Sequence, residues 1–89
     1  MQIWIVMGST GEYSDRGEWV VEAARTEEAA KARVTRLEGL LRELGAESGD
    51  YDTRRAARDG MRSHAEGDPH CDIDYTGTRY WFEPCELRD

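Results

Sequence analysis

The chain has 89 residues, enough for one domain, because a second folding unit would need about 50 residues for its own core. Hydrophobic residues make up 38% and charged residues 35%, and 19 acidic against 12 basic side chains give a net charge of −7. This composition argues against a multidomain enzyme and a basic nucleic-acid-binding domain. No run approaches the ~18 apolar residues of a membrane span, and the first residues lack the basic region of a signal peptide. We therefore expect a single cytoplasmic domain over residues 1–89.

Two strand-like segments open the chain. Residues 2–7 are β-branched, aromatic and apolar on both faces, which predicts a central strand. Residues 8–17 hold three glycines and several short polar residues, which predicts a loop tied down by side-chain hydrogen bonds. Residues 18–24 return to strand composition, so the two segments predict an antiparallel hairpin.

A long helix is predicted next. Thr26 is a good N-cap residue, two glutamates follow in the first turn, and Gly45 is a typical stop. Gly39 weakens the helix and would allow a close approach of another element. One apolar stripe runs along it at steps of three and four: Ala30, Val34, Leu37, Leu40, Leu41 and Leu44.

A second, weaker helix is predicted over residues 52–65. Its apolar stripe is thin and consists of Ala57, Met61 and Ala65. Its other side carries four basic side chains, Arg54, Arg55, Arg58 and Arg62. That side is interpreted as a solvated face, with a contact to an anion or an acidic partner as the alternative.

Residues 72–87 carry the last strand signals, and the strongest are the three aromatic residues at 80–82. A turn at 76–77 either closes a small hairpin, with an extra short strand at 72–75, or precedes one long strand. Pro84 has no N–H for a ladder, so it predicts an edge strand or a bulge near 83–84. A bulge would place Phe82 and Cys85 on one face, whereas a regular strand would form an inner row of Trp81, Cys85 and Leu87.

The order β–β–α–α–β predicts an α+β fold, in which two antiparallel helices cover one face of a small, mainly antiparallel three-stranded sheet. Most of the aromatic residues are expected in that core. Because the strand at 2–7 is apolar on both faces, one of its rows needs a second cover, from a homodimer partner or a target protein. In a simple path of this order, the loops at 8–17 and 67–78 lie at opposite ends of the sheet.

Residues for catalysis or metal binding form no recognisable motif. The loop at 8–17 lacks the lysine of a phosphate-binding loop and leads into a strand. His64 and His70 lie in no catalytic pattern, so no catalytic residue is predicted. Cys71 and Cys85 are expected as reduced thiols, since their spacing to the histidines matches no zinc pattern. We predict a protein without metal, cofactor or enzymatic activity.

Two segments, GSTGEYSDRGEW at positions 8–19 and DYTGTRYWFE at 74–83, resemble small uncharacterised proteins encoded by bacteriophages and prophages. The resemblance extends over nearly the whole chain, with departures at His70-Cys71 and Pro84-Cys85. It implies a phage or prophage accessory protein in the cytoplasm of the bacterial host. Small acidic proteins of this kind often bind host proteins, and some inhibit defence systems, as anti-CRISPR proteins do.

Three functions remain open at this point. The first is non-enzymatic binding of a host bacterial protein through the loops and a sheet face or edge, without direct contact to nucleic acid or membrane. The candidate binding residues are Glu12, Tyr13, Asp15, Arg16, Asp74, Tyr75 and Trp81. The second is a self-associating homodimer that buries a sheet face. The third is a small ligand-binding or nucleotide-binding protein that uses the loop residues, which requires the two loops to be neighbours.

Overall fold

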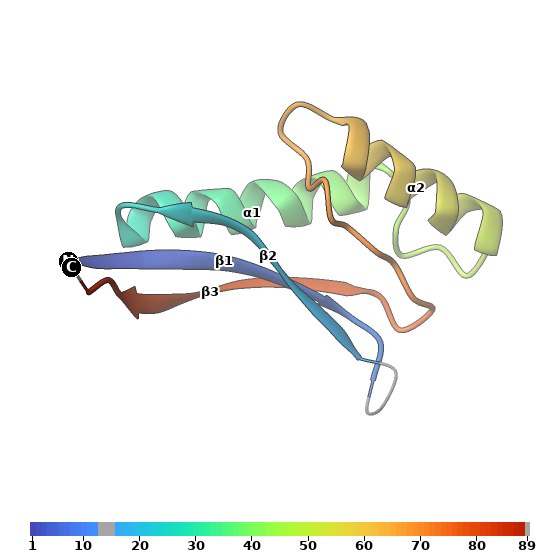
Figure 1. Ribbon diagram of the computed structural model, residues 1–89. Helices are drawn as coiled ribbons and strands as arrows, with labels where there is room; N and C mark the ends of the chain where they lie inside the picture. Colours follow the sequence, from blue (N-terminus) through green and yellow to red (C-terminus); the bar gives the residue numbers. More distant parts are fainter. Residues whose placement is uncertain (13–15, 89) are drawn as a thin grey trace.

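The computed structural model describes residues 1–12 and 16–88 and has one sheet with two helices (Figure 1). The elements in chain order are β1 (Gln2–Thr10), β2 (Gly17–Ala24), α1 (Glu27–Glu43), α2 (Tyr51–Ser63) and β3 (Thr78–Glu86). The sheet order is β2-β1-β3, and both strand pairs are antiparallel. The predicted α+β fold, its element order and the central position of the first strand are confirmed.

The first strand is longer than predicted, because residues 8–10 continue β1 instead of opening the loop. Gly8 explains how. It pairs with Trp19 on one side and Tyr80 on the other. A Cβ atom at Gly8 would lie 2.6 Å from the Trp19 ring, so only glycine lets this indole lie across the strand.

β3 pairs with β1 in an unbroken register from Gln2–Glu86 to Thr10–Thr78. Pro84 lies within this ladder on an edge strand, which is where a residue without an N–H is tolerated. The alternative of a bulge near 83–84 is therefore wrong. A register shift occurs instead in the β1–β2 ladder, between Val6 and Met7.

α1 lies across one face of the sheet and begins and ends as predicted (Figure 1). Thr26 Oγ1 accepts a hydrogen bond from the Ala29 N–H at 3.1 Å, and Gly45 ends the helix with a φ of +84°. A Cβ at Gly39 would meet nothing within 4 Å, so the expected close approach at this glycine is absent.

α2 packs beyond the C-terminal end of α1 (Figure 1). Two helices are predicted to cover the sheet. Among the described residues, α1 makes the contacts with the strands, so α1 alone covers the sheet. Two arginines of α2 donate to backbone carbonyls, Arg54 to Ser48 at 3.1 Å and Arg62 to Cys71 at 2.7 Å. Two of the four arginines on the basic side of α2 therefore hold the segments before and after the helix.

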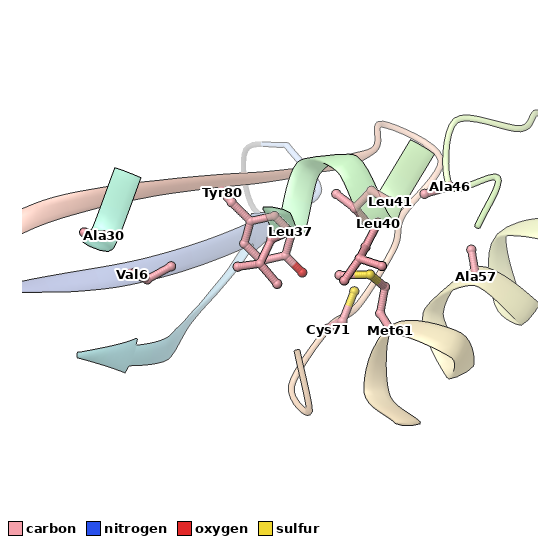
Figure 2. Close-up of a cluster of buried hydrophobic side chains, with 10 residues drawn as sticks. All are labelled: Val6, Ala30, Leu37, Leu40, Leu41, Ala46, Ala57, Met61, Cys71 and Tyr80. Atoms are coloured by element: carbon pink, nitrogen blue, oxygen red, sulfur yellow. The ribbon is translucent and has the colours of Figure 1, made fainter. Parts of the chain in front are cut away.

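The core runs along α1 and continues to α2 (Figure 2). α2 contributes Ala57 and Met61, whereas Ala65 lies beyond the helix and is exposed. Cys71 reaches this part of the core from the segment before β3 (Figure 2). The fully or largely buried apolar residues are Val6, Ala30, Leu37, Leu40, Leu41, Ala46, Ala57, Met61, Cys71 and Tyr80.

A buried carboxylate attaches the segment before β3 to the sheet. Asp68 is 0% exposed. Its Oδ2 accepts from Trp19 Nε1 at 2.7 Å and from the Tyr80 hydroxyl at 2.8 Å, and its Oδ1 accepts from the His70 N–H at 2.9 Å. Three donors on one buried carboxylate satisfy it and fix the two aromatic rings that provide them.

Burial in the same region perturbs two acids, and we expect stability to fall in alkaline solution. Burial raises the pKa of Cys71 from 9.0 to about 11, and it also raises the pKa of Tyr80. As pH rises above about 9, the unfolded chain loses these protons first, so the native state binds more protons and the free energy of unfolding decreases.

Urea unfolding between about pH 8 and about pH 11 measures this effect. The Cys71→Ala variant should show a smaller decrease over that range, because one of the two perturbed acids is gone. Equal decreases in the parent and the variant would contradict the assignment.

Candidate functional site

The two motif segments meet at one end of the sheet, which we call the loop end and define as residues 10–12, 16 and 72–78. Thr10 joins them: its hydroxyl donates to Gly77 O at 2.7 Å and accepts from the Asp74 N–H at 2.7 Å. The expectation that the two loops lie at opposite ends is wrong. β3 runs antiparallel to β1, so it begins beside the residue where β1 ends.

A tight turn over residues 74–77 forms the tip of the loop end. Gly77 N–H donates to Asp74 O at 2.9 Å, Asp74 Oδ1 accepts from Thr76 N–H at 3.2 Å, and Gly77 has a φ of +91°. Aspartate at the first position and glycine at the fourth are typical of a type I turn. The 74–77 contact is an isolated bridge, so the extra strand at 72–75 does not form.

Tyr75 is the most prominent candidate residue at this end. This residue is 81% exposed, while the backbone on both sides of it is held by the bonds of Thr10 and Asp74. Asp74 itself is half-buried, and one of its carboxylate oxygens is used within the turn. The loop end thus presents an exposed aromatic ring on an ordered backbone.

The other predicted binding residues are divided between the loop end and the sheet. Glu12 and Arg16 are exposed and line one pocket together with Gly11 and Arg79. Arg16 also forms an ion pair with Glu18 at 2.8 Å. Tyr13 and Asp15 lie outside the described residues. Trp81 lies farther along β3, at the level of Met7 in β1.

Trp81 belongs to the sheet face opposite α1, which we call the outer face. Val6 and Phe82 pair with each other and both point into the core, so their neighbours in β1 and β3 point the other way. The regular row of Trp81 and Cys85 therefore exists, but the expectation that it is an inner row is wrong. The apolar residues of the outer face are Ile3, Ile5, Met7, Val20, Ala23, Trp81 and Cys85.

In the part of the chain that the structure describes, no helix covers the outer face, and Val20 is 53% exposed. Charged side chains flank it: Glu18 and Arg79 stand on either side of Ser9, and Glu83 stands beside Ile5. An apolar centre with charges around it is typical of a protein-binding surface.

Within residues 1–12 and 16–88, no group of three or more His, Cys, Asp and Glu side chains lies close enough to hold a metal ion. Both cysteines are free thiols; Cys71 is buried and Cys85 is half-buried. None of the helices in the same ranges has the length and apolar character needed to cross a membrane. No family model, curated protein or solved structure that was compared with the chain matches it.

Sequence reasoning missed Thr10 and Asp68 as the residues that connect distant segments. The sequence places Thr10 in a loop tied down by hydrogen bonds to neighbouring residues, and it places Asp68 before Pro69, just after the second helix. Their partners are 64 and 49 residues away in the chain, at Asp74 and Trp19 respectively. No local pattern carries that information, although two aromatic donors in strands do indicate that a buried acceptor is needed.

Proposed function

We propose that this protein acts by binding another protein, without chemistry of its own, and that the loop end is the recognition surface. The observation that carries the proposal is the exposed Tyr75 on a turn that Thr10 ties to β1. Tyrosine is enriched at the energetic centres of protein interfaces. A turn that is already ordered loses little conformational entropy on binding, which favours affinity.

The resemblance to phage and prophage proteins supports a host bacterial protein as the target, with binding in the host cytoplasm. Inhibition of a defence system, as by an anti-CRISPR protein, is the narrower form of this proposal. The net charge of −7 favours a target with a basic surface and a complex that weakens as salt is added.

Substitution of Tyr75 tests the proposal. A tagged parent protein should retain a host protein from bacterial lysate, and Tyr75→Ala should weaken that complex by about 2 kcal/mol, or roughly 30-fold in the dissociation constant. Tyr51→Ala is the matched control, because Tyr51 is 65% exposed at the start of α2. Equal retention by the parent and by Tyr75→Ala, or equal loss in both variants, would rule out recognition through the loop end.

A small-ligand function is the second candidate, supported by a pocket of about 310 Å³ between the end of α1 and residues 76–79. Among the described atoms, the buried Thr76 hydroxyl has no hydrogen-bond partner, and this residue lines the pocket together with Arg42. A ligand that hydrogen-bonds this hydroxyl would raise the Tm of the parent but not of Thr76→Val. A nucleotide or sugar-phosphate panel with no such rise would exclude this candidate for those ligands.

A further inference from the structure

We infer that the outer face binds a second copy of this chain, in a two-fold symmetric dimer whose axis runs parallel to β1. The face of the sheet is a better interface for a second copy than either of its edges. β3 carries Pro84 within its ladder, and the β1–β2 pairing is interrupted by the shift near Met7. Both features hinder the addition of a further strand at an edge. The outer face keeps its apolar row of Ile3, Ile5 and Met7, which no helix among the described residues covers.

Under the proposed symmetry, apolar side chains of β2 face apolar side chains of the partner's β3. Rotation about an axis parallel to β1 places β1 over β1 of the partner, and β2 over the partner's β3, at the same level along the strands. Val20 and Trp81 both flank Met7, so each Val20 then faces the Trp81 of the other copy. This contact joins the exposed Val20 to the aromatic side chain of the face.

Glu18 and Arg79, two opposite charges at the face, match under the same rotation. Glu18 and Arg79 both flank Ser9, so the Glu18 carboxylate of each copy faces the Arg79 guanidinium of the other. Glu18 also pairs with Arg16 of its own chain through Oε1. The second carboxylate oxygen can accept the Arg79 contact. The symmetry thus creates two identical ion pairs at the rim of the interface.

A face-to-face dimer with its two-fold axis perpendicular to β1 does not combine full overlap of the apolar row with the pairing of Arg79 with a carboxylate. With the axis perpendicular to β1 and the faces fully overlapping, Trp81 would lie over Glu83 and Arg79 over Cys85, so the two copies of β3 would bring no opposite charges together. If that stack were shifted until Arg79 met Glu83, the row would no longer overlap at Ile3. The axis parallel to β1 covers the whole row and pairs Glu18 with Arg79, while Glu83 faces Ala23 of the other copy.

The area of the outer face sets the expected affinity of the dimer. Three strands of nine, eight and nine residues form a face about 30 Å long and about 15 Å wide, which lies at the small end of protein interfaces. We therefore expect a dissociation constant in the micromolar range.

The dimer also bears on recognition. An axis parallel to β1 keeps the strand direction, so both loop ends emerge at the same end of the dimer. A target with two copies of the recognised surface would then bind with avidity. This last consequence rests on the proposed function, whereas the dimer itself does not.

Charge reversal tests the dimer without any target. Sedimentation equilibrium of the purified chain, from about 1 to about 200 μM, should show a monomer–dimer equilibrium. Glu18→Arg or Arg79→Glu should each raise the dissociation constant by about tenfold, because like charges then face each other twice. The double variant Glu18→Arg/Arg79→Glu should return it to near the parent value. Urea unfolding at low micromolar concentration controls for the fold of each variant.

A parent that remains monomeric over the whole range would overturn the inference and leave recognition through Tyr75 to stand on its own test. A dimer that none of the reversals weakens would overturn the proposed axis. Conversely, a dimer with the predicted rescue but no effect of Tyr75→Ala on target capture would support the inference and contradict the proposed function.

Discussion

Replacing Asp68 by alanine should lower the free energy of unfolding by about 4 kcal/mol, because it leaves several donors without a partner. The Trp19 indole N–H, the Tyr80 hydroxyl and the His70 N–H all donate to this buried carboxylate. Removing one partner of a buried polar group costs more than the bond itself contributes, since the remaining group is neither paired nor hydrated. Urea unfolding monitored by tryptophan fluorescence measures the change directly.

Two variants sharpen this test. Asp68→Asn keeps one acceptor oxygen and should fall between the parent and Asp68→Ala. Asp59→Ala is the matched control, because Asp59 is an exposed aspartate of α2 whose ion pair with Arg58 is at the surface. We expect it to change stability by less than about 0.5 kcal/mol. A similar loss for Asp59→Ala and Asp68→Ala would show that the buried network contributes nothing special.

Gly67→Ala should destabilise the fold by a comparable amount, about 3–5 kcal/mol, for a steric reason. A Cβ at Gly67 would lie 1.9 Å from the Met61 carbonyl oxygen, which already accepts the Asp68 N–H at 2.9 Å. That oxygen belongs to the backbone of α2 and cannot move aside as a flexible side chain would. The substitution must therefore displace Asp68 from its partners Trp19 and Tyr80.

Gly39→Ala provides the matched control for this second prediction. Gly39 lies within α1 and a Cβ there meets nothing within 4 Å, so alanine should stabilise the helix by about 0.5–1 kcal/mol. Opposite signs for the two glycine substitutions are expected in urea unfolding. If Gly67→Ala acts through Asp68, the double variant Gly67→Ala/Asp68→Ala should lose less than the sum of both single losses.

The elements of this fold follow from local sequence signals. Periodicity and capping predict α1 between its N-cap Thr26 and the glycine stop at 45, and the β-branched run at 2–7 predicts the central strand. The apolar residues on both faces of the strand at 2–7 also predict that one of its rows needs a second cover, and the row that no described helix covers is Ile3, Ile5 and Met7. These features depend on neighbours within a few residues, which is the range over which a pattern carries information.

The arrangement of those elements depended on contacts between distant residues. A simple path of the predicted element order places the loops at 8–17 and 67–78 at opposite ends of the sheet. In the structure α2 packs against α1 beyond the C-terminal end of that helix (Figure 1). Hydrogen bonds of Asp68 and Thr10 attach the segment before β3 beside the end of β1. The sequence allows Trp81 on either face of the sheet, and its pairing with Met7 of β1 places it on the outer face.

The distance between spin labels in the dimer tests the account most directly. Labels on Tyr75→Cys and Leu87→Cys, in a Cys85→Ser background, mark opposite ends of a sheet about 30 Å long, while the buried Cys71 remains unlabelled. With the axis parallel to β1, the distance between two Tyr75→Cys labels should be shorter than the distance from a Tyr75→Cys label to a Leu87→Cys label on the partner. The reverse order, or no intermolecular coupling at all, would contradict a dimer that joins two outer faces and presents both loop ends together.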